Sequence, residues 1–371
     1  MRDVARYSPF VSNRGVATSV LFSPLTIRGL TFRNRIVVSP MCQYSSVDGY
    51  ADDWHLVHLG SRAIGGAAAV LTEASAVLPE GRISPDDLGI WKDDHIEPLA
   101  RVFRFVERHG AIPGMQLAHA GRKASTSAPW KGGRPLPVSA RGWQPIFAPS
   151  AVAFDTGYQE PEALDLQGIA RIVEAFAQAA RRAVEAGSRI IELHAAHGYL
   201  LHEFLSPLSN RRGDGYGGTF DNRTRIVREV VEAVRRVLPD RDALFVRISG
   251  TDWAEGGWTA DDSVALARQL MPLGADVCDC SSGGLVPHAR IPVGAGYQVP
   301  FAERIRRETA MPTAAVGLIT APEQAEQIVR SGQADLIVMA RELLRDPYWP
   351  LHAAARLRQE APVPPQYLRA F

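Results

Sequence analysis

The stretch Ile190-Ile191-Glu192-Leu193-His194-Ala195-Ala196-His197-Gly198-Tyr199-Leu200-Leu201 decides how the rest of the chain is interpreted. An apolar run ends abruptly in two histidines, a glycine and a tyrosine, which is typical of a buried strand that delivers polar side chains to a site. Strict alternation along a strand would send His194 and His197 to opposite faces. Both can serve one pocket only if the chain leaves strand geometry between them.

The polar residues of this stretch suit carbonyl chemistry. Two neutral imidazoles can donate hydrogen bonds to one carbonyl oxygen, and a phenol with a reference pKa of about 10 stays protonated at neutral pH. Two other interpretations stay open. His194 and His197 could be satisfied core histidines, or they could bind zinc with His202 or Glu203 as a third ligand, although no recognised zinc spacing is present.

Composition describes an ordinary globular protein. Hydrophobic residues make up 46% of the 371 residues and charged residues 22%. The net charge of +1 gives no reason to expect a nucleic-acid partner. Cys42, Cys278 and Cys280 are too few for a disulfide framework, which favours a reducing cytoplasm. The N-terminus lacks a signal-peptide core, and no run reaches the ~18 apolar residues of a membrane span, so neither export nor membrane insertion is expected.

Strand-like and helix-like segments alternate along most of the chain. Strands are expected at 34–39, 67–72, 112–117, from Ile190, and at 243–248, 276–280, 313–316 and 335–339. Helices are expected at 52–64, 94–107, 165–185, 222–237, 260–270, 301–308, 322–330 and 343–357. Eight strands, each followed by a helix, indicate parallel pairing with right-handed crossovers and favour a closed barrel.

We therefore predict an α/β fold, a single (β/α)8 TIM barrel with an inserted capping segment. Residues 1–20 form a leader, 21–360 the barrel, 119–160 the Gly/Pro/Trp-rich insertion, and 361–371 a C-terminal tail at a subunit interface. A doubly wound sheet is the alternative fold. It would require a Gly-x-Gly-x-x-Gly turn after its first strand, and none follows Val38.

Polar residues cluster at the predicted carboxyl ends of the strands, where barrels of this kind hold their sites. They are Ser39 to Tyr44, Glu73-Ala74, Gln116, His194 to Tyr199, Arg247, Ser281 to Gly284, Val316-Gly317 and Ala340-Arg341. Gly317 and Arg341 follow the last two strands, the usual place for a phosphate on a barrel, although Gly317 could serve only a turn. A flat ring across the mouth would then meet Gln116 and Arg247.

Several of these segments resemble the Old Yellow Enzyme family of FMN-dependent ene-reductases, in particular its bacterial thermophilic-like subgroup of NADPH dehydrogenases and xenobiotic reductases. The resemblance covers about 21–369 and rests on Ser39-Pro40-Met41-Cys42-Gln43-Tyr44, Gln116-Leu117-Ala118-His119-Ala120-Gly121-Arg122-Lys123, Ile191 to Leu200, Ser206 to Arg212, Tyr216-Gly217-Gly218, Arg341 to Pro347 and Gln366-Tyr367-Leu368-Arg369.

The resemblance implies a non-covalently bound FMN and a nicotinamide co-substrate, NADPH, with NADH possible. The residues implied to hold FMN are Ser39, Pro40, Met41, Cys42, Ala74, Gln116, Arg247, Gly317, Ala340 and Arg341. The implied substrate side consists of Tyr44, His194, Ala195, Ala196, His197 and Arg369. His194 and His197 would polarise the carbonyl of an activated alkene, and Tyr199 would protonate its α-carbon after hydride reaches the β-carbon.

The resemblance also implies a homodimer or homotetramer in which Arg369 reaches the neighbouring subunit's site. Two positions depart from the family pattern. Ala340 replaces the usual glycine before Arg341, and we predict an ordinary negative φ there. Trp253 stands where a tyrosine is usual.

Three other functions compete with this interpretation. The iron–sulfur dienoyl-CoA reductase or amine dehydrogenase type would need cysteines and further domains that this sequence does not show. A barrel lyase or aldolase would place a Schiff-base lysine or metal carboxylates at strand ends. A catalytically inactive FMN-binding protein would keep the phosphate site without turnover.

Overall fold

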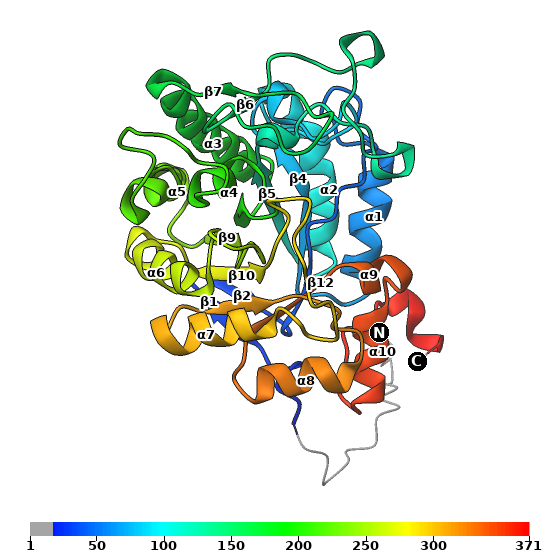
Figure 1. The fold of residues 1–371 in the computed structure, drawn as a ribbon. Helices are drawn as coiled ribbons and strands as arrows, with labels where there is room; N and C mark the ends of the chain where they lie inside the picture. Colours follow the sequence, from blue (N-terminus) through cyan, green and yellow to red (C-terminus); the bar gives the residue numbers. More distant parts are fainter. Residues whose placement is uncertain (1–17, 371) are drawn as a thin grey trace.

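A closed parallel barrel forms the centre of the computed structural model, which describes residues 18–370 (Figure 1). Within this part of the chain the barrel has eight strands: β3 (Ile36–Val38), β4 (Ala69–Ala76), β5 (Ile112–Ala118), β8 (Ile190–Ala195), β9 (Ala243–Ser249), β10 (Val277–Ser281), β11 (Thr313–Ala315) and β12 (Leu336–Met339). Pairing of β12 with β3 closes it, with Val338 opposite Val37. The predicted TIM barrel is confirmed. The leader expected at 1–20 lies outside the described residues, apart from 18–20.

Helices surround the barrel between successive strands. They are α1 (Asp53–Ile64), α2 (Ile96–Arg108), α3 (Leu166–Glu185), α5 (Phe220–Val237), α6 (Ala260–Leu270), α7 (Val299–Thr309), α8 (Pro322–Arg330) and α10 (Trp349–Arg356). Asp52, Asp165, Thr219 and Thr259 cap four of them through their side-chain oxygens. Among residues 18–370, no helix combines the length and apolar character that a membrane crossing requires.

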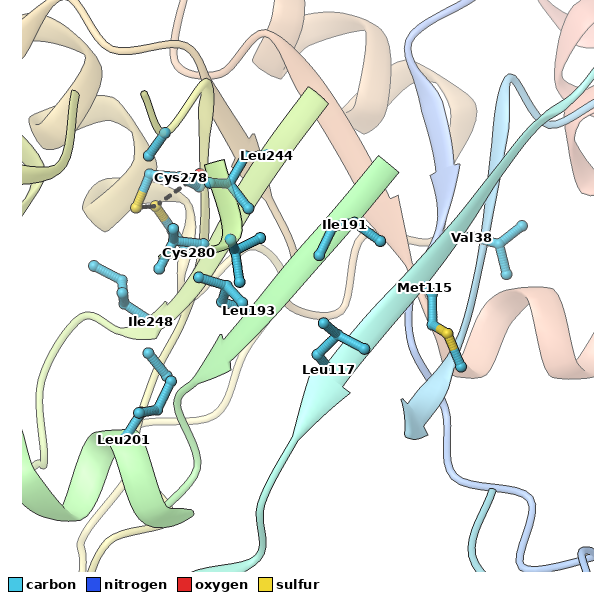
Figure 2. Packing of buried hydrophobic residues seen from close by; sticks show 14 of the residues in the cluster. Val38, Met115, Leu117, Ile191, Leu193, Leu201, Leu244, Ile248, Cys278 and Cys280 are labelled. Atoms are coloured by element: carbon cyan, nitrogen blue, oxygen red, sulfur yellow. Dashed lines mark hydrogen bonds between the residues drawn. The ribbon is translucent and has the colours of Figure 1, made fainter. Parts of the chain in front are cut away.

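The larger hydrophobic core lies between the outer face of the strands and these helices. Figure 2 shows part of it, with Met115, Leu117, Ile191 and Leu193 projecting from neighbouring strands. Cys278 and Cys280 pack into this core as free thiols, with their sulfurs 3.8 Å apart. Because successive strand residues alternate between faces, the residues between these positions point into the barrel.

The prediction of one continuous helix over 343–357 is wrong, because the structure has two helices there, α9 (Arg341–Arg345) and α10. Pro347 disfavours helical backbone at the preceding residue, and Asp346 is extended with φ −132°. A second short helix, α4 (Leu200–Leu205), follows β8 and was not expected.

A hairpin of β1 (Leu25–Ile27) and β2 (Leu30–Phe32) precedes the barrel and was also not expected. Its Phe32 is fully buried and stacks on Phe245 of β9, with ring centroids 6.4 Å apart. Phe32 belongs to the same apolar cluster as Leu71, Ile190 and Val338, which fill the lower half of the barrel interior. The hairpin therefore closes the end of the barrel at which the strands begin.

The segment 119–160 has little regular structure and runs across the top of the molecule in Figure 1. It contains short 3-10 turns and β6 (Phe147–Ala148), which pairs in parallel with β7 (Glu162–Ala163) just beyond its end. Its first turn, η3 (Gly121–Lys123), contacts α4. The insertion thus reaches the loops that follow β8.

Candidate active site

Three aromatic side chains gather where the chain leaves β8. The strand ends at Ala195, and His197 takes the left-handed backbone conformation with φ 59°. The ring of His194 lies 5.1 Å from that of His197 and 4.9 Å from that of Tyr199, centroid to centroid, with both pairs nearly perpendicular. The chain therefore leaves strand geometry between the two histidines, as the sequence required for a shared pocket.

These side chains are held in their uncharged forms. Desolvation, followed by the nearby charge of Arg247, lowers the pKa of His194 and of His197 well below the ordinary histidine value. Desolvation raises the pKa of Tyr199 well above that of a free phenol. The backbone N–H of Ala196 donates to Nδ1 of His194 at 3.3 Å, which leaves the proton on Nε2 of that ring. At neutral pH the cluster offers donors without net charge.

A lysine from the insertion ties the two loops of this site together. Lys123 Nζ donates to the carbonyl oxygens of His197 at 2.8 Å and Gly284 at 3.0 Å. The loops approach so closely that a Cβ on Gly198 would overlap the carbonyl of Gly284. Lys123 Nζ also lies 5.2 Å from the ring centroid of Tyr199, and burial lowers its pKa to about 8.

The segment after β3 lines the opposite side of the barrel mouth. Ser39 Oγ accepts a hydrogen bond from Nη1 of Arg247 at 3.0 Å. Desolvation, followed by the charge of Glu73, raises the pKa of Cys42 well above the usual thiol value, so the thiol is protonated. Tyr44 has a positive φ of 50° and packs edge-on against Trp130 of the insertion.

A cavity of about 180 Å³ opens at the ends of β9 to β12. Three arginines line it, Arg247, Arg341 and Arg345. Arg247 pairs with Asp279 and Arg345 with Glu342, whereas Arg341 has no ion-pair partner among residues 18–370. Gly317 has φ 131°, which requires glycine, whereas Ala340 has φ −109°, so the predicted negative φ is confirmed. Arginines beside an open cavity fit an anionic cofactor such as FMN, and the unpaired Arg341 is suited to its phosphate.

Comparison with known proteins identifies the family. The model of the NADH:flavin oxidoreductase / NADH oxidase family matches residues 20–360. The NADPH dehydrogenases of Geobacillus thermodenitrificans and Bacillus subtilis are 49% and 48% identical, each over 95% of this chain and 99% of their own length. Morphinone reductase matches with TM-score 0.77 and 26% identity over 94% of this chain and 92% of its own. The chain belongs to this family.

More specifically, it is an Old Yellow Enzyme, an FMN-dependent NAD(P)H oxidoreductase. A complex of 2-naphthoyl-CoA reductase also matches, with TM-score 0.82 and 24% identity, but this chain covers only 52% of that protein, so the likeness concerns the barrel alone.

Two buried acids near Arg247 in this Old Yellow Enzyme were missed by the sequence interpretation. Glu192 of β8 accepts a hydrogen bond from Gln116 Nε2 at 2.8 Å, and Asp279 of β10 lies 3.3 Å from Arg247 Nε. The sequence signal for Glu192 was the spacing Ile190, Glu192, His194, which places all three on the inner face of β8, and Asp279 likewise stands within the apolar run of β10. An acid inside an apolar run was therefore the clue.

Other residues considered from the sequence lie apart from the cluster of His194, His197 and Tyr199. His202 approaches Asp252 at 2.9 Å and accepts from the Gly198 N–H, while Glu203 accepts from the Arg122 N–H. Both support the loops rather than complete a metal site with His194. Trp253 has φ 56° and packs on Phe301. Arg369 is exposed in η7 (Pro365–Ala370).

Proposed function

We propose that this enzyme is an ene-reductase that acts on α,β-unsaturated carbonyl or nitro compounds. The observation that carries the proposal is the gathering of two neutral imidazoles and one protonated phenol. Through His197 this cluster contacts Ser281, which lines the cavity together with Arg247. A neutral imidazole can donate a hydrogen bond to a carbonyl or nitro oxygen without placing a full charge in a desolvated site. The subgroup resemblance and the relatives named NADPH dehydrogenase point the same way.

His194 and His197 would hold the oxygen of the substrate. His194 presents Nε2–H because its Nδ1 accepts from Ala196. His197 Nε2 now shares a hydrogen bond of 2.6 Å with Ser281 Oγ, and a substrate oxygen would replace that partner. Tyr199 would then protonate the α-carbon, since its raised pKa keeps the phenol proton in place until carbanion character develops.

FMN, when bound, would take hydride from the nicotinamide and pass it to the β-carbon of the alkene. Ser39, Pro40, Met41, Cys42, Ala74 and Gln116 would border its ring. Arg247 would face the ring edge that gains negative charge on reduction, and Gly317, Ala340 and Arg341 would hold the phosphate. Tyr44, Ala195 and Ala196 would complete the substrate side.

We also propose that the working enzyme is a homo-oligomer whose tail, residues 361–371, contributes Arg369 to a neighbouring site. The exposure of η7 leaves Arg369 accessible to such a contact. Removal of 366–371 should raise the KM for enones, and an unchanged KM would contradict this part of the proposal. The free thiols of Cys42, Cys278 and Cys280 are consistent with work in a reducing cytoplasm.

The test is an anaerobic titration of the purified flavoprotein. NADPH should bleach the flavin band, and 2-cyclohexenone should restore it. A band that bleaches but does not recover with enones, maleimides or nitroalkenes would contradict ene-reduction. A band that NADPH does not bleach would favour a catalytically inactive FMN-binding protein.

A further inference from the structure

Three charged side chains from neighbouring strands meet inside the upper half of the barrel. Glu192 of β8, Arg247 of β9 and Asp279 of β10 are 1%, 5% and 0% exposed. Asp279 lies opposite Arg247 in the β10–β9 register. With both acids ionised, this desolvated cluster would hold two negative charges against one positive charge. Such an imbalance is costly in a site closed to water.

The hydrogen bonds around Asp279 show how the imbalance is resolved. Neither carboxylate oxygen of Asp279 receives a hydrogen bond from the N–H and hydroxyl donors of residues 18–370, and Arg247 Nε faces it at 3.3 Å without hydrogen-bond geometry. The carboxyl of Glu192 adjoins Asp279 closely enough for the two groups to share a proton. A protonated Glu192 is thus a donor within reach of the unsatisfied carboxylate.

The surroundings favour the proton on Glu192. Desolvation, followed by the charge of Asp279, raises the pKa of Glu192 well above its ordinary value. Asp279 lies closer to a compensating cation, since its ion-pair partner is Arg247. Glu192 instead faces the neutral amide of Gln116. His194 and His197 also lie near Arg247, and their uncharged forms leave the balance unaltered. The thiol of Cys280, beside Asp279, has a pKa raised well above its ordinary value and is uncharged as well.

We propose that Glu192 is protonated at neutral pH and donates a hydrogen bond to Asp279, and that this pair positions Arg247 and balances its charge beneath the flavin. Arg247 is anchored from two sides, by Asp279 at Nε and by Ser39 at Nη1. The three side chains then carry no net charge together. The flavin ring would therefore face a guanidinium donor in a fixed position, whose positive charge Asp279 partly offsets. The pair would thus limit how much more tightly the protein binds reduced FMN than oxidised FMN. The second part of this inference rests on FMN lying over Arg247.

The protonation state can be measured without the cofactor. Infrared spectroscopy of the FMN-free protein should show the C=O stretch of a buried carboxylic acid that persists at neutral and mildly alkaline pH. Burial also raises the pKa of Glu203 to about 8, so that acid contributes a band of the same kind, and the decisive observation is the difference between the wild-type and Glu192→Gln spectra. This difference should contain the C=O stretch of one carboxylic acid, because an amide replaces the acid of Glu192. A difference spectrum without such a band at neutral pH would overturn the proposed protonation.

The charge balance can be measured as the ratio of affinities for reduced and oxidised FMN. Glu192→Gln should leave this ratio close to that of the wild type, because the amide N–H₂ can still donate to Asp279 while its oxygen accepts from Gln116. The double variant Glu192→Gln/Asp279→Asn removes the remaining negative charge beside Arg247. It should favour reduced FMN about tenfold more than Glu192→Gln does, equivalent to about 30 mV in the midpoint potential.

An equal midpoint potential in the two variants would overturn the charge-balancing role of the pair. If the wild-type protein bound no FMN, the cofactor assignment would fail, but the infrared result would still decide the protonation of Glu192. If the double variant failed to fold, the midpoint of Asp279→Glu would serve instead. The longer carboxylate keeps the charge while displacing it from Arg247, and an unchanged midpoint there would equally contradict the role.

Discussion

The lower and upper halves of the barrel interior are built from the same strands but have opposite character. On β9, Phe245 packs in the apolar lower half and Arg247, two residues on, carries the charge of the upper half. β8 changes in the same way from Ile190 to Glu192. Two residues of strand correspond to only about 6.6 Å, so the change takes a single step of the pleat. The lower half supplies stability and the upper half chemistry. We therefore expect mutations in the lower half to change the free energy of unfolding and mutations in the upper half to change catalysis or cofactor binding.

The largest expected effect is on catalysis, in the variant Tyr199→Phe. The variant keeps the ring against His194 but loses the proton donor, so reoxidation of reduced flavin by an enone should slow by about 10²–10⁴-fold. Flavin reduction by NADPH should stay near the wild-type rate, because that step needs no acid at this position. Stopped-flow measurement of the two half-reactions checks this. Equal slowing of both would assign Tyr199 to binding.

Phe245→Ala, in the lower half, should lower stability while leaving catalysis unchanged. Loss of the ring removes its contact with Phe32 and leaves a cavity, which should lower the free energy of unfolding by about 3–5 kcal/mol. The flavin spectrum and both half-reactions of the folded protein should be retained. Denaturant unfolding with Phe245→Leu as a milder control measures the effect. If Phe245→Ala proved as stable as wild type but catalytically slow, the two halves would not be separable.

Arg341→Ala tests whether the cavity in the upper half holds the phosphate of FMN. Charged hydrogen bonds contribute about 1.5–3 kcal/mol, so the dissociation constant of FMN should rise roughly ten- to hundredfold. Arg356→Ala is a suitable control, because Arg356 is exposed and pairs with Glu323 away from the cavity. Titration of the FMN-free proteins with FMN gives both constants. Equal affinities in the two variants would place the phosphate elsewhere.

The smallest effect, measured per pH unit, concerns the pH dependence of stability. Burial lowers the pKa of His119, at the end of β5, from 6.5 to about 4, so the unfolded chain binds a proton there that the folded protein does not. Stability should therefore fall as the pH drops from about 6.5 towards 4, by at most about 1.4 kcal/mol per pH unit for this residue. In His119→Gln this contribution should disappear from the pH dependence of unfolding. An unaltered slope would show that His119 titrates normally.

The barrel itself was predictable from the sequence because strand and helix periodicities alternate regularly. The hairpin of β1 and β2 was not, because it lies outside the strand–helix alternation by which the equally short β3 and β11 could be recognised. The break between α9 and α10 has a signal in the sequence, because Pro347 disfavours helical backbone at Asp346. The site residues at strand ends could be named one by one. The pairing of Glu192 with Asp279 could not, because it depends on how neighbouring strands align across the barrel.

The close approach of Gly198 to Gly284 also constrains how this enzyme can diversify. Because the two backbones nearly touch and Lys123 bridges them, a change in either loop alone meets the other. Laboratory evolution that randomises only the loop after β8 should therefore yield mostly inactive variants. Libraries directed at the part of the insertion around Trp130, which is largely exposed beside Tyr44, leave Lys123 and that contact intact. New substrate ranges are more accessible through the insertion than through the loops that carry the chemistry.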